Sequence, residues 1–148
     1  MNLLVAAAVL AGSFLAQEPG SACANVSKED AIAVLGSLKQ GPTELGPQCV
    51  FTTEGLSLMV GRLADQEPET ATMMLNVPRN RAKPGDVVKE EPGIGDRAVS
   101  EVSGGHLAII AVRGTTVWTF GVDHVYRKDI SAMLPKLRDL ARKVVDGK

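Results

Sequence analysis

The fold is decided by the stretch "RAVSEVSGGHLAIIAVRGTTVWTFGV", residues 97–122. Three runs in it have strand character, at 97–102, 106–112 and 116–122, and they are joined by "SGG" and "GT", which suit hairpin turns. The middle run is almost wholly apolar, which is typical of a central strand covered on both faces. In the third run Trp118 and Phe120 fall on one face. The stretch therefore predicts a three-stranded antiparallel meander.

A second hairpin and a first helix are predicted upstream of the meander. "CVFTT" (49–53) and "LSLMVGRL" (56–63) are separated by "EG", a short turn of the kind that hairpins use. Before them, Ser27 and Asp30 have the spacing of a helix N-cap and its reciprocal acid. We expect this helix to end at "QGP", residues 40–42, and "TELGPQ", residues 43–48, to be a loop.

Two further helices complete the predicted fold. Pro68 suits a first helical turn and Pro78 is expected to stop that helix, although the 66–84 segment could instead be a mobile flap. Near the C-terminus Ser131 is the expected N-cap, with Pro135 close to the first turn. Apolar residues follow at helical spacing: Ile130, Met133, Leu134, Leu137, Leu140, Ala141, Val144 and Val145. The order α-β-β-α-β-β-β-α predicts an α+β fold, a single antiparallel β-sheet of about five strands with helices packed over it.

Composition indicates one ordinary globular domain, residues 23–148. The 148-residue chain has 45% hydrophobic, 22% charged and 3% aromatic residues, so we expect an aliphatic core. Its net charge of −1 provides no global field for nucleic acid or for an anionic membrane. The chain from residue 124 onward carries seven bases against three acids. This basic end is either a partner surface or the solvated face of the last helix.

The first 16 residues, "MNLLVAAAVLAGSFLA", have the character of a signal peptide. They carry no charged side chain, and they are too few for a bilayer span of roughly 20 residues. We expect cleavage near Ala16, with Ala22 or Ala24 as alternatives, and no membrane span after cleavage. The protein is thus expected to be exported, periplasmic or secreted. A lipid anchor at Cys23 is the second choice, because such a motif wants a large aliphatic residue where Gly20 stands.

The two cysteines bear on the choice between a cleaved signal peptide and a lipid anchor. In an exported chain Cys23 and Cys49 most simply pair, and the chain-entropy model values such a bridge at roughly 3.5 kcal/mol. If Cys23 were acylated or cut away, Cys49 would be left as an odd thiol. The disulfide is the more economical interpretation.

The most distinctive motif is "PGIGDRAV", residues 92–99, but it does not fit a phosphate loop. A Rossmann fingerprint needs a third glycine and a following helix, whereas a strand is expected here. A P-loop needs Gly-Lys-Ser/Thr, which is also missing. We expect Gly93 and Gly95 to serve backbone geometry. Asp96 and Arg97 remain candidate contacts.

No catalytic or metal-binding pattern stands out. His106 and His124 lack the spacing of a metal site, and no GxSxG elbow accompanies Asp123 and His124. No cofactor and no metal are expected, and an enzyme is the less favoured class. Candidate binding residues, each with surface solvation or core packing as its alternative, are Asp96, Arg97, Arg79, Arg81, Lys83 and Trp118.

The order of the motifs resembles a group of small exported bacterial domains, many of them lipoproteins of unknown function. "VSKEDAIAVLG", then "CVF", "PGIGDRA" and "LRDLARKVV", are similar to a Cys…LG…Cys…GxGDxA…LA pattern over residues 23–145. The resemblance implies a PsbP-like α+β sandwich, an envelope or secreted location, a Cys23–Cys49 disulfide and no catalytic set. We therefore expect an exported, non-catalytic binding or interaction domain. Its partner would be a protein or a small molecule, and the groove between the 66–84 segment and the sheet is the first place to look. A lipid-anchored envelope component and a small hydrolase using Asp96, Asp123 or His124 are the alternatives.

Overall fold

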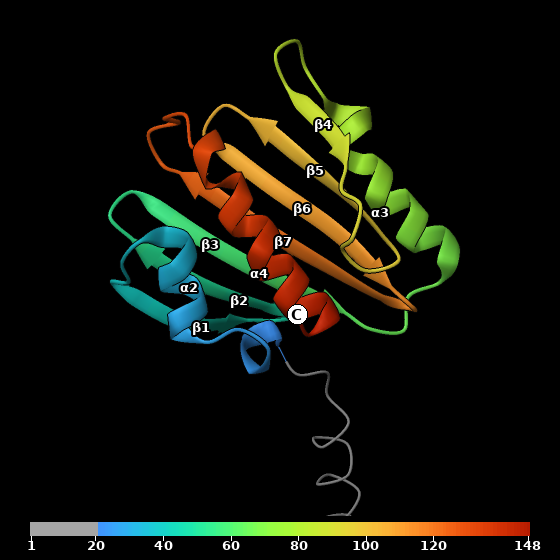
Figure 1. Ribbon diagram of the computed structural model, residues 1–148, viewed down its shortest axis with the longest axis horizontal. Helices are drawn as coiled ribbons and strands as arrows, with labels where there is room; N and C mark the ends of the chain where they lie inside the picture. Colours follow the sequence, from blue (N-terminus) through green and yellow to red (C-terminus); the bar gives the residue numbers. More distant parts are fainter. Residues whose placement is uncertain (1–20) are drawn as a thin grey trace, which may run out of the picture.

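A single antiparallel sheet of seven strands organises the computed structural model, which describes residues 21–148 (Figure 1). The predicted signal segment, 1–16, lies outside the described residues. Neighbouring strands follow the order β1-β2-β3-β7-β6-β5-β4. The strands are β1 Gln40–Leu45, β2 Gln48–Thr53, β3 Leu56–Leu63, β4 Val87–Glu90, β5 Arg97–Ser103, β6 His106–Arg113 and β7 Thr116–His124. The helices are α2 Lys28–Leu35, α3 Pro68–Arg81 and α4 Leu134–Asp146, with 3-10 turns η1 Ala22–Ala24 and η2 Ser131–Met133.

The predicted meander is confirmed as β5, β6 and β7. Successive strands pair antiparallel, with Ile110 of β6 opposite both Val99 and Thr119. The predicted hairpin is also confirmed, since β2 and β3 pair around Gly55, whose φ is +71°. β3 then pairs with β7, which joins the hairpin to the meander in one sheet.

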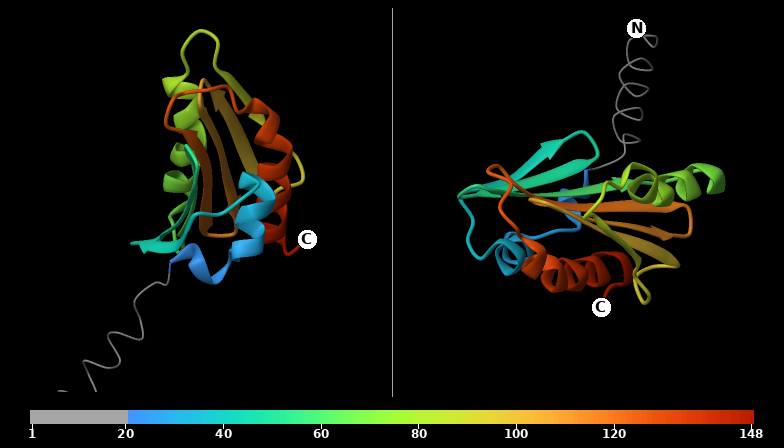
Figure 2. Two further views of the ribbon diagram at one scale, coloured as in Figure 1. Left: turned by 90° about the vertical axis from the view of Figure 1, so that its left-hand side faces the viewer. Right: turned by 90° about the horizontal axis from the view of Figure 1, so that it is seen from above.

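Helices cover both faces of this sheet (Figure 2). α2 and α4 lie on one face, over a main core that includes Phe51, Leu58 and Phe120, all almost fully buried. α3 lies on the opposite face, where Ala71 and Leu75 pack in a smaller cluster with Val99, Ile110 and Val117. The central strand β6 contributes side chains to both cores, as its apolar run predicts.

The prediction of about five strands in the order α-β-β-α-β-β-β-α is wrong, because the sheet has seven strands and both edge strands were missed. β1 lies where a loop was expected. It is an exposed edge strand that holds a cis Gly41–Pro42 bond and an irregular register, and an edge is where a sheet tolerates proline. β4 is only four residues long and mostly exposed, so its sequence carries little strand pattern.

The first helix begins as predicted and ends earlier. In α2 the Ser27 hydroxyl accepts a hydrogen bond from the Asp30 N–H, and the Asp30 carboxylate accepts one from the Ser27 N–H. Gly36 then adopts a left-handed conformation with φ +87°, so the helix stops at Leu35 and not at 40–42. Glycine at this position relieves the strain that a β-carbon would cause.

The other two helices depart from prediction at one proline and one cap. The 66–84 segment forms a helix, and α3 continues through Pro78 to Arg81. Pro78 lies within the last turn and its ring is buried, which offsets the lost backbone hydrogen bond. At the C-terminal helix Ser131 is not the N-cap, because it starts the 3-10 turn that precedes α4. Pro135 does lie in the first turn of α4, as expected.

Candidate functional site

The motif loop 92–96 fixes the C-terminal helix to the sheet. Gly95 has φ +59°, and a β-carbon added there would lie 2.6 Å from the Val112 carbonyl oxygen. The N–H of Gly95 donates to the carboxylate of Asp146, at the end of α4, at 3.0 and 3.2 Å. Ile94 is 1% exposed. Gly93 and Gly95 both have positive φ, as the sequence suggested, and Gly95 also allows close packing against Val112.

Asp96 and Arg97, the two side chains of the motif predicted as contacts, both have partners within the chain. The Asp96 carboxylate accepts a 2.7 Å hydrogen bond from the N–H of Gly114, in the β6–β7 turn. The Arg97 guanidinium donates to Glu90 at 2.7 Å. Trp118 is also engaged, because it is 7% exposed, stacks on Phe120 and has the Arg62 guanidinium 5.6 Å from its ring centroid.

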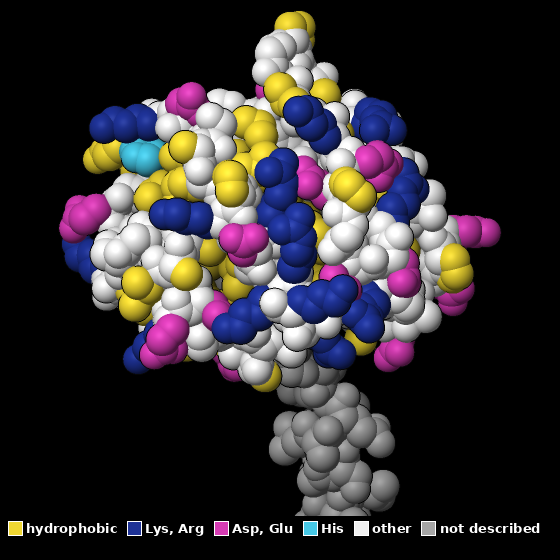
Figure 3. All heavy atoms as spheres, in the orientation of Figure 1, with side chains coloured by type: hydrophobic (Ala, Val, Ile, Leu, Met, Phe, Trp, Pro, Cys, Tyr) yellow, Lys and Arg dark blue, Asp and Glu magenta, His cyan; other side chains and the backbone are white. Residues whose placement is uncertain are grey.

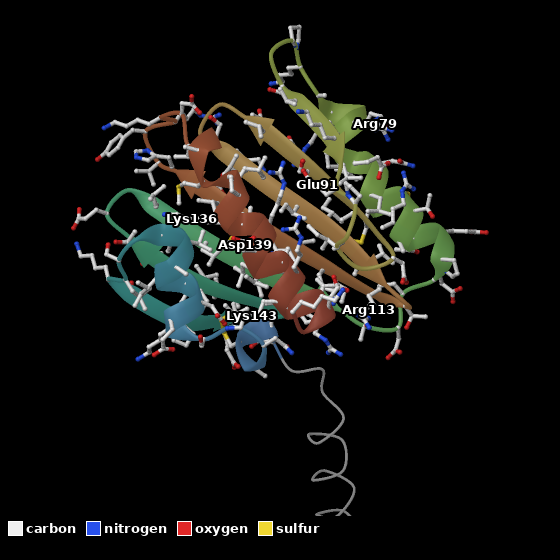
Figure 4. The ribbon with its side chains drawn as sticks, in the orientation of Figure 1. Arg79, Glu91, Arg113, Lys136, Asp139 and Lys143 are labelled. Atoms are coloured by element: carbon white, nitrogen blue, oxygen red, sulfur yellow. A yellow bond between two sulfur atoms is a disulfide. The ribbon has the colours of Figure 1, made fainter. Side chains whose placement is uncertain are left out.

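A buried acid next to the motif is bound by α4 as well. Glu91 lies between the sheet and α4 (Figure 4), and both of its oxygens accept hydrogen bonds from Arg138, at 2.7 and 2.9 Å. Ser100 donates to the same carboxylate at 2.8 Å. Burial alone would raise the pKa of Glu91, but the hydrogen bonds from Arg138 and Ser100 outweigh it and hold the pKa below its usual value.

The basic C-terminal segment of the chain contributes to these contacts between α4 and the rest of the domain. A band of Lys and Arg side chains crosses the face on which α4 lies (Figure 3). Several of these bases have acidic partners: Arg138 binds Glu91, Lys143 binds Asp30 and Arg113 binds Asp146. The band is therefore largely neutralised by the domain's own carboxylates.

A polar pocket of about 410 Å³ opens at the other end of the meander, where the β5–β6 turn meets α3 and the segment after β7. We call it the His106 pocket. It is lined by Arg81, Glu101, Ser103, Gly105, His106, Asp123, His124, Val125 and Arg127. The register places Ser103, His106 and Asp123 side by side across three strands. A groove was expected between the 66–84 segment and the sheet. Its centre is filled by the smaller apolar cluster around Leu75, and the His106 pocket lies at one end of this groove.

An ion pair and a side-chain hydrogen bond lie in the wall of the His106 pocket. Arg81, at the end of α3, donates to the buried Glu101 at 2.6 Å. The hydrogen bond to Glu101 raises the pKa of the Arg81 guanidinium and outweighs burial, which would lower it. Nδ1 of His106 lies 2.6 Å from Oδ1 of Asp123. Nε2 of His106 is the one buried side-chain nitrogen or oxygen in residues 21–148 that has no hydrogen-bond partner.

The segment after β7 closes one side of the pocket over a glycine. Arg127 has φ +53°, an uncommon backbone conformation for a residue with a side chain. A β-carbon on Gly105 would lie 2.4 Å from the Cα of Arg127, so only glycine lets the two segments touch. The N–H of His124 donates to the Gly105 carbonyl at 2.8 Å, and the N–H of Arg127 donates to the His124 carbonyl at 2.9 Å.

The structure gathers some of the predicted site residues and separates others. Asp123 pairs with His106 and not with its neighbour His124, whose Nδ1 accepts from the Tyr126 N–H at 3.1 Å. Asp96 sits near Val112, at the far end of β6 from His106, about 20 Å away at 3.3 Å per residue. Asp96 and Asp123 therefore do not converge in one site. Of the predicted loop bases, Arg81 reaches the pocket; Arg79 and Lys83 do not line it.

The sequence did not predict Glu101, Ser103, Arg127 or the role of His106 as parts of this site. The signal that could have found them is the register of the two hairpins, since a two-residue turn at Gly104-Gly105 places Ser103 opposite His106. No sequence pattern predicts that Arg127 lines the pocket, because its position depends on the contact with Gly105.

Comparison with known proteins gives no relative for this chain: no family model, no curated protein and no solved structure matches it. The chemistry therefore rests on the geometry alone. Residues 21–148 contain no cluster of three or more His, Cys, Asp or Glu side chains that could hold a metal ion. In the same residues no helix combines the length and apolarity that a membrane span requires.

The predicted disulfide is confirmed. Cys23 and Cys49 are bridged, which ties η1 to β2 and suggests an oxidising compartment. Ala22 beside it is fully buried, and its N–H donates to the Pro47 carbonyl at 3.2 Å. Cleavage after Ala22 or Ala24 would remove part of this packing.

Proposed function

We propose that this protein is an exported, non-catalytic binding domain whose ligand occupies the His106 pocket. The observation that carries the proposal is the polar wall of this pocket, which holds the Arg81–Glu101 ion pair, the His106–Asp123 hydrogen bond and Arg127. A concave site lined by converging polar groups is typical of a binding site for a small polar ligand. Export is supported by the disulfide and by the apolar segment 1–16.

The test is a fragment screen followed by two-dimensional NMR of the intact, oxidised domain. Bound fragments should shift the amides of the β5–β6 turn and the imidazole of His106. The His106→Asn variant should lose these shifts, and the Asp139→Asn control should keep them, because Asp139 is an exposed residue of α4 outside the pocket. If the binding fragments perturb only other surfaces, the pocket is not the ligand site and the proposal fails.

A hydrolase is the second candidate, favoured by the alignment of Ser103, His106 and Asp123 on one face of the sheet. Against it, the Lys83 N–H and then the Ser103 hydroxyl hold the pKa of the Asp86 carboxyl below its usual value, so Ser103 is engaged with Asp86. Nε2 of His106 makes no hydrogen bond to Ser103. Turnover of an ester panel that Ser103→Ala abolishes would favour the enzyme over the binding domain.

A lipid anchor at Cys23 is the alternative for location. An acyl-carrying thioether and the Cys23–Cys49 bridge need the same sulfur, so the two states exclude each other. Mass spectrometry of the protein from its native envelope separates them. A diacylglyceryl mass on Cys23 would support the anchor, and an unmodified disulfide would support release.

A further inference from the structure

We infer that the His106 pocket binds a zwitterion of the amino-acid class, whose carboxylate contacts Arg127 and whose ammonium group contacts Asp123. This inference rests on the proposed function and adds the chemical class of the ligand. Both side chains line the pocket, and its volume of about 410 Å³ lies in the range of small-molecule sites. Three features of the wall support this ligand: its charges, the accessibility of the two side chains and the backbone of Arg127.

The wall holds two arginines and two acids, and only one of each is neutralised by a partner. Arg81 is bound to Glu101 at 2.6 Å. Asp123 accepts a hydrogen bond from Nδ1 of His106, which is neutral in the formal charge of the chain at pH 7. That hydrogen bond orients the carboxylate and leaves its charge in place. Within the part of the chain that the structure describes, no ion pair includes Arg127. The wall therefore presents one uncompensated carboxylate and one uncompensated guanidinium.

These two groups are also the accessible ones. The side chain of Asp123 is 42% exposed and Arg127 is an exposed residue, whereas Glu101 is 4% exposed beneath Arg81. A guanidinium binds a carboxylate through two parallel hydrogen bonds, and a carboxylate accepts strong hydrogen bonds from an ammonium group. A ligand that carries both charges on one carbon can bridge the two side chains.

The backbone of Arg127 holds its side chain at the pocket in a costly conformation. Its φ of +53° is in the left-handed region, where glycine is favoured over arginine. The segment rests against Gly105, where an added β-carbon would lie 2.4 Å from the Cα of Arg127. Residues in such sparsely populated conformations cluster at binding and catalytic sites. Glycine would avoid this cost, so the presence of a guanidinium here points to a use for it.

Three matched probes separate the two contacts: norleucine, which has both charges; hexanoate, which lacks the ammonium group; and pentylamine, which lacks the carboxylate. All three carry an alkyl chain that can lie against Val125, a residue of the pocket wall that is 68% exposed. Affinity for the intact, oxidised domain is measured by titration, with NMR of the amides of 103–106 and 123–127. We expect norleucine to bind about tenfold or more tightly than either of the other probes, since a charge-assisted hydrogen bond is worth about that factor.

Two variants test the contact with the carboxylate. Arg127→Gln should weaken norleucine at least about tenfold and should not weaken pentylamine. Arg127→Gly should weaken norleucine equally while relieving the backbone strain, so its loss of binding cannot come from a failure to fold. Lys128→Gln removes the neighbouring exposed base, which does not line the pocket, and should change none of the three affinities.

Asp123→Asn tests the contact with the ammonium group. The amide oxygen of asparagine can still accept the hydrogen bond from Nδ1 of His106, so the variant removes the charge and keeps the acceptor. It should weaken norleucine about tenfold and should not weaken hexanoate. Asp139→Asn, on the exposed side of α4, is the control and should leave all three probes unchanged.

The outcomes distinguish this inference from the proposed function. If hexanoate or pentylamine binds as tightly as norleucine, or if Asp123→Asn or Arg127→Gln leaves norleucine affinity unchanged, the zwitterion assignment is wrong and the pocket remains the binding site. Fragments that bind in the pocket while norleucine does not would have the same meaning. If neither norleucine nor any fragment perturbs the pocket amides, both proposals fail.

Discussion

At the scale of single residues, Gly95 is where sequence most directly dictates structure. Its φ of +59° lies in the left-handed region, and the Val112 carbonyl leaves no room for a side chain. Its N–H also binds Asp146, so the same residue joins the motif loop to α4. The position therefore combines a left-handed conformation that favours glycine, a close contact and a tertiary hydrogen bond.

We predict that Gly95→Ala lowers the free energy of unfolding by about 3 kcal/mol, because backbone strain and the clash with Val112 add together. Gly93→Ala is the matched control. Gly93 has φ +83° but nothing within 4 Å of an added β-carbon, so only the strain of about 1 kcal/mol should appear. Urea denaturation measures both variants. Equal losses would show that the contact with Val112 carries no cost.

At the scale of elements, α3 is held less firmly than α4. It packs on β5 and β6 through a small cluster around Leu75, whereas α4 is held by the main core and by two carboxylates. Arg81, at the end of α3, is nevertheless part of the His106 pocket. Movement of α3 would therefore reshape the pocket.

We predict that Leu75→Ala destabilises α3 locally by about 2–3 kcal/mol and speeds amide exchange in 68–81 before the rest of the chain. Met73→Ala serves as the control, because Met73 lies on the same helix and is 63% exposed. The readout is hydrogen exchange followed by NMR. Uniform acceleration across the sheet would contradict a separately opening helix.

The elements that sequence predicted are those with strong local patterns. The alternation in β7, the Ser27–Asp30 capping box and the apolar repeat of α4 are each encoded within a few residues. β1 and β4 escaped prediction because each pairs along only one edge and is stabilised by its partner rather than by its own composition. The path of α3 through Pro78 depends on burial that no local pattern reveals.

The candidate site was less predictable than the fold, for a related reason. The sequence predicted Arg81 and Asp123 as candidate site residues. Their partners, Glu101 and His106, lie on other elements of the fold. The residues of the motif, Asp96 and Arg97, proved to have intramolecular partners instead. Pairing across a sheet is a tertiary property, and a single sequence does not contain the register that creates it.

At the scale of the whole molecule, the disulfide joins the start of the domain to the sheet. Cys49 is fully buried, and Cys23 lies beside the packed Ala22. We predict that the double variant Cys23→Ala/Cys49→Ala loses about 3 kcal/mol of unfolding free energy. Dithiothreitol should lower the stability of the natural protein by a similar amount and leave the variant unchanged. A reductant-insensitive natural protein would mean that the bridge adds no stability.

The response to acid should begin at α4, because two carboxylates with lowered pKa values hold it. Burial would raise the pKa of Asp30, but hydrogen bonds from Lys143 and Ser27 outweigh it, as Arg138 and Ser100 do for Glu91. A carboxyl with a lowered pKa in the folded state stabilises the protein above its unfolded pKa, and this contribution is lost as the pH falls through the folded value.

We therefore predict that stability is constant near neutrality and falls below about pH 4, where unfolded carboxyls take up protons. Glu91→Gln should cost about 2–3 kcal/mol at pH 7, since it leaves Arg138 without its charge partner, and should cost progressively less in acid. Glu54→Gln, in a pair that is 71% and 86% exposed, should change little at any pH. Urea titrations across pH give these differences.

Hydrogen exchange tests where the acid response begins. Because α4 is bound to α2 through Asp30 and to the segment before the motif through Glu91, amides of 134–146 should exchange first in acid. Simultaneous exchange of α3 and α4 would show that the two carboxylates do not govern the acid response.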